Sequence, residues 1–193
     1  MRRPPSVVWL ASVLVTLGTG CTKDAAAPRV ADVTGAWHSP THPIGDAVHV
    51  VVFTSHECPI ANSYAPTLAK LHEAWRTEPR VRLFLVHVDP DLTVADARRH
   101  AAEYALPGAV LLDPTHAVVR ASGASITPEA VVWSAGEVVY RGRIDDQWRK
   151  LGSRAPAAST NDLRDAVAHA LRGEPTPLPH PPAVGCLLPE PGV

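Results

Sequence analysis

The segment from residue 48 to residue 54 (Val-His-Val-Val-Val-Phe-Thr) is a nearly continuous run of apolar and β-branched residues. A strand with one face in water alternates apolar and polar side chains, whereas a strand covered on both faces need not alternate. The run therefore predicts a strand in the interior of a sheet. A sheet with helices on both faces is the arrangement of α/β proteins.

Helix and strand signals alternate along the middle of the chain. A helix is expected to begin at Pro59, which suits the first helical position, and to end before Pro79, with a kink at Pro66. Further strands are expected at residues 81–88, 109–112, 130–134 and 138–143, the last two as a hairpin, and further helices at residues 93–104, 115–121 and 160–172. Candidate helix caps are Thr93 and either Thr160 or Asn161. The prediction is an α/β fold with a central mixed β-sheet flanked by helices.

Residues 1–21 have the pattern of a secretory signal peptide. Arg2 and Arg3 precede an apolar run at residues 7–17, which is shorter than the about 20 residues that span a bilayer. The end of the segment resembles a bacterial lipoprotein box, in which the cysteine, here Cys21, is lipidated. Gly18 departs from the leucine of that box, and an ordinary signal peptide cleaved nearby is the alternative. We expect export to the periplasmic side of a bacterial membrane, with a lipid anchor at Cys21.

The C-terminal residues 173–193 contain seven of the 20 prolines, a spacing that excludes helices and central strands. They are expected to form an extended tail, and residues 22–35, which lack periodicity, are expected to form a tether. The folded domain is therefore expected over residues 36–172. Within the tail, Cys186 lies in the apolar patch at residues 183–188, which we expect to dock on the domain.

The charge balance excludes one class of partners. Lys and Arg total 18 against 19 for Asp and Glu, which leaves a net charge of -1. Binding to nucleic acid requires clustered basic residues, which this sequence does not have. No nucleic-acid partner is therefore expected.

Cys58 follows the first predicted strand and directly precedes the helix that begins at Pro59. The free N–H groups and the dipole of a helix N-terminus favour a thiolate, which is the nucleophilic form of cysteine. Glu57 opposes ionisation by charge repulsion, whereas a protonated His56 would favour it. Cys58 is therefore the candidate nucleophile.

Residues 51–61 (Val-Val-Phe-Thr-Ser-His-Glu-Cys-Pro-Ile-Ala) and Ile126-Thr127-Pro128 resemble the thioredoxin-like superfamily. The resemblance implies a thioredoxin-like fold with an inserted strand-helix unit before Pro128 and a cis peptide bond at Pro128. It also implies that Thr127 and Pro128 lie against Cys58 and position a partner chain. Ser55 and Pro59 are further candidate positioning residues. Residues 140–146 and 184–186 look like an exported bacterial redoxin subgroup that has a single active-site cysteine and a cysteine-bearing tail.

The sequence departs from the thioredoxin pattern at one position. Thioredoxins have Cys-x-x-Cys, in which the second thiol resolves a mixed disulfide, but the second position here is Ala61. Cys186 could supply this thiol if the tail folds back, because the entropy of loop closure grows slowly with length. It could equally form a static disulfide with Cys58 or remain a free buried thiol. The implied function is an exported thiol-disulfide oxidoreductase that acts on a thiol or disulfide of a partner protein without a cofactor.

Two alternatives to this function stay open. One is a peroxiredoxin-like thiol peroxidase acting on a peroxide, since Ser55 stands three residues before Cys58 as Thr or Ser does in those enzymes. They also require an arginine near the thiolate, for which the candidates are Arg120, Arg141 and Arg143. The other alternative is a non-catalytic redoxin scaffold that is stapled by a permanent Cys58–Cys186 disulfide.

The ten histidines raise the question of a metal site. His38, His42, His49, His56 and His87 have no ligand spacing and are expected to be solvated surface groups, and Asn62 stands where a related copper-delivery family has a second cysteine. No metal is therefore expected. Trp133 and Trp148 are expected to be core and loop anchors, and Asp145 and Asp146 to cap the turn after the last strand.

Overall fold

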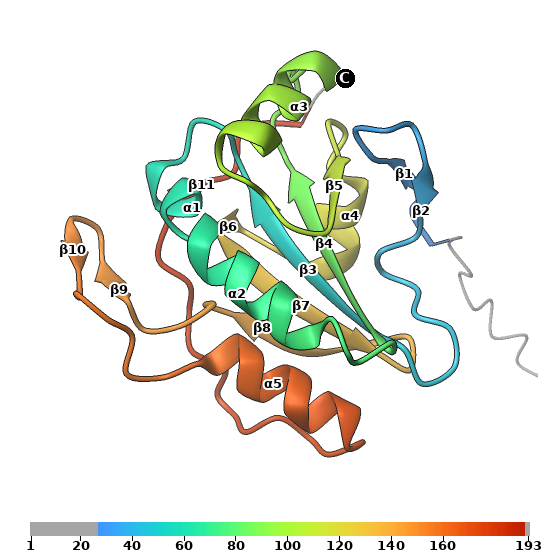
Figure 1. The fold of residues 1–193 in the computed structure, drawn as a ribbon, viewed down its shortest axis with the longest axis vertical. Coiled ribbons are helices and arrows are strands. Elements are labelled where there is room, and N and C mark those ends of the chain that lie inside the picture. Colours follow the sequence, from blue (N-terminus) through green and yellow to red (C-terminus); the bar gives the residue numbers. More distant parts are fainter. Residues whose placement is uncertain (1–26, 192–193) are drawn as a thin grey trace, which may run out of the picture.

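The centre of the computed structural model, which describes residues 27–191, is a five-stranded mixed sheet (Figure 1). The strand order is β5-β4-β3-β7-β8. The strands are β3 (Val48–Thr54), β4 (Val81–His87), β5 (Ala109–Leu112), β7 (Glu129–Ser134) and β8 (Glu137–Gly142). β3, β4 and β5 are parallel, whereas β7 is antiparallel to both β3 and β8. The predicted α/β architecture with a central mixed sheet is confirmed.

Every residue of β3 is buried, as the continuous apolar run predicts. Side chains alternate between the two faces of a strand, so Val50 and Val52 belong to one hydrophobic core and Val51 and Phe53 to the other. Helices cover the first face: α1 (Pro59–Ser63), α2 (Ala65–Trp75) and α5 (Asp162–Leu171). The second face is covered by α4 (Ala117–Ser122) and by β1 (Val30–Ala31). The sheet therefore separates two cores.

The helix expected between Pro59 and Pro79 is two helices, α1 and α2, which meet at Tyr64. Pro66 lies in the first turn of α2, where backbone N–H groups have no acceptor within the helix, so the lack of an N–H in proline costs no hydrogen bond. The prediction of one kinked helix is therefore wrong, because Pro66 starts a helix instead of bending one. The helix α3 (Val94–Glu103) begins as predicted at Thr93, whose Oγ1 accepts a hydrogen bond from the Asp96 N–H at 3.1 Å.

Six two- or three-residue strands were not predicted, because segments this short have no periodicity. They form three antiparallel pairs: β1 with β2 (Trp37–His38), β9 (Trp148–Lys150) with β10 (Ser153–Arg154), and β6 (Ile126–Thr127) with β11 (Cys186–Leu187). The β11 pairing docks the tail on the domain, as its apolar patch predicts.

Part of the segment predicted as a tether belongs to the folded domain. Val30 is a member of the second core, and Asp32 forms a β-bridge with Leu111 beside the edge strand β5. The predicted signal peptide and Cys21 lie outside the described residues. Between residues 27 and 191, none of the helices has the length and hydrophobicity needed to cross a bilayer.

Candidate active site

Cys58 lies at the edge of the sheet where the parallel strands β3 and β4 end. β3 and β4 pair in register from Val48 and Val81 to Thr54 and His87, so the loops that follow both strands leave the sheet side by side. Cys58 is the N-cap residue of α1, and its carbonyl accepts a hydrogen bond from the Asn62 N–H at 3.0 Å. Its side chain is almost inaccessible, since the residue is 2% exposed. Pro59 occupies the first turn of α1, as predicted.

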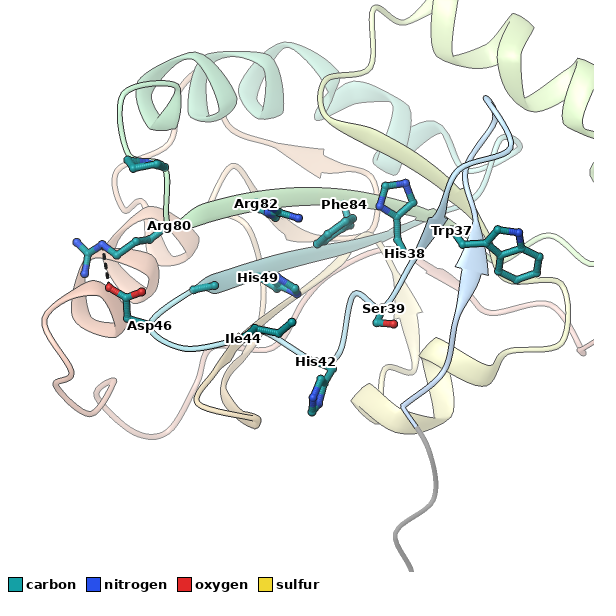
Figure 2. A pocket seen from close by; sticks show the side chains of 12 residues that line it. Trp37, His38, Ser39, His42, Ile44, Asp46, His49, Arg80, Arg82 and Phe84 are labelled. Carbon is teal, nitrogen blue, oxygen red and sulfur yellow. Dashed lines mark ion pairs between the residues drawn. The ribbon is translucent and has the colours of Figure 1, made fainter.

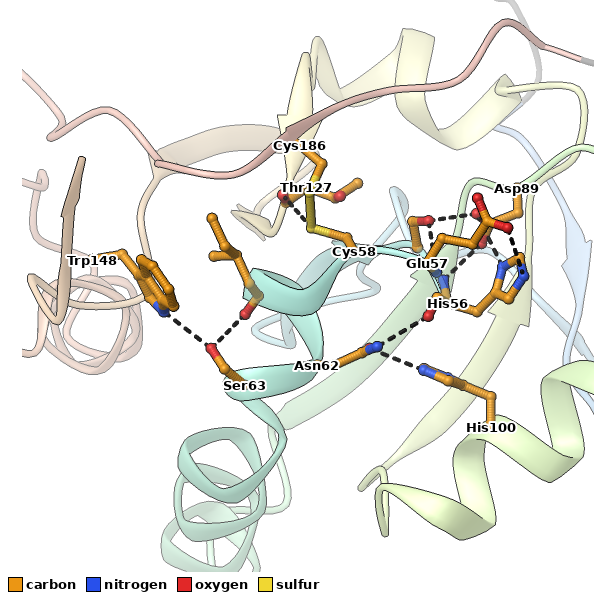
Figure 3. Close-up of a disulfide and its surroundings, with 12 residues drawn as sticks. His56, Glu57, Cys58, Asn62, Ser63, Asp89, His100, Thr127, Trp148 and Cys186 are labelled. Carbon is orange, nitrogen blue, oxygen red and sulfur yellow. Dashed lines mark hydrogen bonds and ion pairs between the residues drawn. A yellow bond between two sulfur atoms is a disulfide. The ribbon is translucent and has the colours of Figure 1, made fainter. Parts of the chain in front are cut away.

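The Cys58 sulfur is bonded to Cys186, 128 residues further along the chain (Figure 3). The two Cα atoms are 6.1 Å apart, within the range of ordinary disulfides. The pairing of β11 with β6 brings Cys186 to this position, because it places Cys186 opposite Thr127 and Leu187 opposite Ile126. The structure therefore joins the two cysteines that the resemblance suggests as a pair.

Thr127 lies against the disulfide, as the resemblance implies, and Pro128 directly follows it. The peptide bond between them is cis, and the Thr127 carbonyl oxygen is 3.3 Å from the Cys58 sulfur. A reduced Cys58 thiol can donate a hydrogen bond to this oxygen, whereas a disulfide sulfur has no proton to give. Thr127 is completely buried, and its hydroxyl has no hydrogen-bond partner among the described residues.

A buried carboxylate holds the loop that precedes Cys58. Asp89, which follows β4, accepts hydrogen bonds from the Ser55 hydroxyl at 2.5 Å and from the His56 N–H at 3.1 Å. The His87 Nδ1 is a third neighbour, at 3.3 Å. Burial raises the pKa of Asp89, but the hydrogen bonds from His87, Ser55 and His56 outweigh burial and hold this pKa well below its ordinary value. Ser55 is therefore directed to Asp89 and positions the loop before Cys58.

The same network continues from α1 to α3 through Asn62. The Asn62 amide donates to the His56 carbonyl at 3.0 Å, and the His100 Nε2 donates to the Asn62 Oδ1 at 2.9 Å (Figure 3). Burial lowers the pKa of His100 to about 4, and the neighbouring His87 and His56 rings contribute to the decrease. Sequence reasoning missed this network. The one available signal was that Asp89 and Cys58 both follow parallel strands, whose carboxyl ends share an edge.

The arginines considered for peroxide activation have their hydrogen bonds elsewhere. Arg120 donates to the Thr115 carbonyl at 2.6 Å, Arg141 to the Gly123 carbonyl at 2.9 Å, and Arg143 to the Asp162 carboxylate at 2.8 Å. The peroxidase alternative therefore gains no support from these contacts.

The tryptophans and Asp145 behave as predicted, whereas Asp146 does not cap the turn but binds the segment that precedes α5. Trp133 is buried in the second core, and the Trp148 Nε1 donates to the Ser63 hydroxyl at 3.0 Å, which ties the β9 segment to α1. Asp145 accepts from the Gln147 N–H at 2.9 Å, and Asp146 accepts from the Ser159 N–H at 2.6 Å. Both aspartates therefore stabilise the segment after β8.

The prediction that the histidines are solvated surface groups is wrong for two of the five. His49 is 7% exposed and His87 is fully buried, because both belong to strands of the central sheet. His38, His42 and His49 line a surface pocket of about 370 Å³ beside the starts of β3 and β4, away from the carboxyl ends that carry Cys58 (Figure 2). Figure 2 shows the His38 and His42 rings pointing away from one another. No group of three or more metal-binding side chains within residues 27–191 is arranged to hold a metal ion.

Comparison with protein-family models yields no match, and comparison with curated proteins yields none either. Solved structures do resemble the chain. A hypothetical protein from Sinorhizobium meliloti is 23% identical, with a TM-score of 0.72 over 85% of this chain and 91% of that one. A secreted disulfide oxidoreductase from Mycobacterium tuberculosis is 16% identical, with a TM-score of 0.52 over 76% and 96%. A thioredoxin-like protein from Aeropyrum pernix is 15% identical, with a TM-score of 0.51 over 76% and 89%.

Proposed function

Because the chain has the thioredoxin-like fold, we propose that it is a thiol-disulfide oxidoreductase whose active pair is Cys58 and Cys186. The observation that carries this proposal is the Cys58–Cys186 disulfide between the start of α1 and a tail strand that lies beside cis Pro128. Of the two sulfur atoms, that of Cys58 lies at a helix N-terminus, where a thiolate is stabilised. Cys58 is therefore the sulfur that attacks a partner disulfide and that leaves when the exchange runs in reverse. Cys186 then takes the role that the second cysteine of Cys-x-x-Cys has in thioredoxins.

The proposed exchange has two steps. The Cys58 thiolate attacks one sulfur of a partner disulfide, so that a Cys58–partner bond forms and the other partner sulfur leaves as a thiolate. The Cys186 thiolate then attacks the Cys58 sulfur, which closes the Cys58–Cys186 bond and releases the partner's remaining sulfur. In sum, the partner disulfide gains two electrons and two protons, and the dithiol of this protein loses them. The same steps in reverse oxidise a partner dithiol.

The secreted disulfide oxidoreductase from Mycobacterium tuberculosis supports this proposal at the level of the fold. Fold alone does not determine activity, so the proposed activity depends on the cysteine pair. Cys58 is the N-cap residue of α1 and Cys186 belongs to the two-residue strand β11, so we expect an opened bond to release β11 and to leave α1 in place.

The decisive test is whether the disulfide opens in the folded protein and passes electrons on. The mature chain is equilibrated with increasing dithiothreitol, and one portion is treated with a maleimide so that its free thiols can be counted. A second portion, reduced in the same way and freed of dithiothreitol but not treated with maleimide, is mixed with insulin. We expect two thiols to appear at millimolar dithiothreitol without loss of the folded circular dichroism spectrum. Reduction of insulin is expected from the wild type and not from Cys58→Ser.

The Cys186→Ser variant separates the roles of the two cysteines. This variant retains the nucleophile Cys58 but lacks the thiol that resolves the mixed disulfide. A disulfide between Cys58 and insulin should therefore accumulate, and a non-reducing gel should detect it. A disulfide that opens only when the protein unfolds would overturn the proposal in favour of the stapled scaffold. Consumption of hydrogen peroxide by the wild type, without reduction of insulin, would overturn it in favour of the peroxidase.

We further propose that the protein is exported and anchored to the membrane through Cys21, on the basis of the signal pattern in residues 1–21. Expressed in a bacterium with labelled palmitate, the wild type should carry the label and sediment with membranes. The Cys21→Ser variant should carry no label. An unlabelled wild type in the soluble fraction would contradict the anchor.

A further inference from the structure

The tail reaches the active site along a fixed path. It passes β8, where the Arg143 N–H donates to the Pro181 carbonyl at 3.0 Å and the Thr176 hydroxyl donates to the Val139 carbonyl. The tail then ends on β6 as the strand β11, whose pairing places Cys186 opposite Thr127. This last part carries the sulfur that is bonded to Cys58, so an incoming sulfur atom that bonds to Cys58 must take the place of Cys186.

The contact between the tail and β6 is closer than a side chain allows. A Cβ atom added at Gly185 would lie 1.8 Å from the Thr127 carbonyl oxygen, 2.5 Å from the Thr127 carbonyl carbon and 3.0 Å from the Pro128 nitrogen. All three are backbone atoms, so no side-chain rotation can relieve the clash. The neighbouring Leu187 is different, because it is 85% exposed and its side chain does not contact the site closely.

We propose that β11 occupies the place of the partner chain and that its sequence indicates the partner's: a partner cysteine that reaches Cys58 beside Thr127 reacts fastest when glycine precedes it. The inference rests on the proposed function and adds a substrate class, which is an extended polypeptide containing Gly-Cys. Such a segment would add to β6 as a strand in the register that Gly185 and Cys186 now occupy. The residue after the cysteine is unrestricted, as the exposure of Leu187 indicates.

The proposal has a consequence for the order of events. A partner thiolate that attacks the Cys58 sulfur forms a Cys58–partner disulfide and expels Cys186 as a thiolate, so no other oxidant or reductant takes part. β11 must leave β6 in the same process, because both chains use the same edge. The tail therefore competes with every partner.

Peptides test this preference directly. Full-length protein with Cys21→Ser and Cys186→Ser is loaded at Cys58, its one remaining cysteine, with thionitrobenzoate, and the release of this group by a peptide thiol is followed by absorbance. Three peptides differ only around the cysteine, with the sequences Gly-Cys-Leu, Ala-Cys-Leu and Gly-Cys-Ala. We expect Gly-Cys-Leu to react at least tenfold faster than Ala-Cys-Leu, and Gly-Cys-Ala to react within twofold of Gly-Cys-Leu. The rates of the three peptides with free dithionitrobenzoate correct for differences between the thiols themselves.

The outcomes distinguish the inference from the function on which it rests. Equal corrected rates for the glycine and alanine peptides would overturn the preference for glycine, while reduction of insulin by the wild type would still support the proposed function. Release of thionitrobenzoate by mercaptoethanol but by none of the peptides would also overturn it, because β6 would then accept no chain from outside.

A matched pair of tail variants tests the same contact within the protein. Gly185→Ala should shift the equilibrium with dithiothreitol at least tenfold toward the reduced form, because the clash with Thr127 disfavours the closed tail. Leu187→Ala should leave this equilibrium within twofold of the wild type. An unchanged equilibrium in Gly185→Ala would show that the tail does not need the close approach, and would contradict the proposal.

Discussion

At the scale of single residues, the site depends on one buried carboxylate as much as on the cysteines. Asp89 binds the Ser55 hydroxyl and the His56 N–H, which are two groups of the three-residue loop between β3 and Cys58. Hydrogen bonds to a charged acceptor are stronger than those to a neutral one, and breaking a buried charged network is costly. Asp89 therefore fixes the direction in which the chain enters α1.

Replacement of this carboxylate should loosen the loop. We expect Asp89→Asn to lower the free energy of unfolding by about 2–4 kcal/mol, since an amide group would face donors that need an acceptor. Reaction of Cys58 with a protein disulfide should slow as well. The exposed Asp91 provides the control, because Asp91→Asn should change stability by less than about 0.5 kcal/mol. Urea unfolding measures the free energy of unfolding of the two variants. An equal decrease in Asp89→Asn and Asp91→Asn would refute the role of Asp89.

His100 gives the molecule a defined sensitivity to acid. Its pKa of about 4 in the folded state lies below the ordinary value of 6.5, so between these values the unfolded chain binds a proton that the folded chain does not. Stability therefore falls as the pH falls. Between pH 7 and pH 5 the wild type should lose up to about 2 kcal/mol more than His100→Gln, as measured by urea unfolding. His72→Gln, which replaces an exposed histidine, should follow the wild type, and an equal loss in His100→Gln would contradict the prediction.

Local order along the chain indicated Cys58 and Pro59, and the family resemblance indicated Thr127 and Cys186, whereas the hydrogen-bond network around Asp89 and Asn62 was not predicted. Cys58 and Pro59 could be placed at a helix start because strand, cysteine and proline follow one another. Asn62 and His100 could not be paired, because their contact joins α1 to α3, and no pattern within either helix indicates it.

At the scale of elements, the long strands and helices were predictable and the two-residue strands were not. β3 and α3 have apolar runs or a cap that are visible in the sequence. β6 and β11 have only two residues each, so their pairing is decided by tertiary contacts and by the absence of a side chain at Gly185. The tail patch indicated that docking would occur but not where.

The helix α5 holds the first core in place through Leu163, which is completely buried. Leu163→Ala should lower the free energy of unfolding by about 2–5 kcal/mol, because it removes buried methyl groups and leaves a cavity. Leu151 allows the same substitution at a site that is 68% exposed, where the loss should be within about 0.5 kcal/mol. Comparable losses at the two sites in urea unfolding would show that α5 contributes little to the core.

At the scale of the whole molecule, the disulfide joins the tail to the start of α1, two segments that are 128 residues apart in the sequence. The sheet, with its two cores, was predictable because buried parallel strands must be covered on both faces. The path of the tail was not, because a proline-rich segment has no pattern that indicates direction. Its closure depends on one covalent bond and on contacts with β6 and β8.

A cross-link between residues 128 positions apart removes many conformations from the unfolded chain. Cys186→Ser should therefore lower the free energy of unfolding by about 2–5 kcal/mol relative to the oxidised wild type. Reduced wild type should match the variant, and the variant itself should not respond to dithiothreitol, since it has no disulfide between α1 and the tail. Urea unfolding with and without reductant gives all four values. If the reduced wild type kept the stability of the oxidised form, the bond would add nothing to the fold, and the tail would be held by its contacts with β6 and β8 alone.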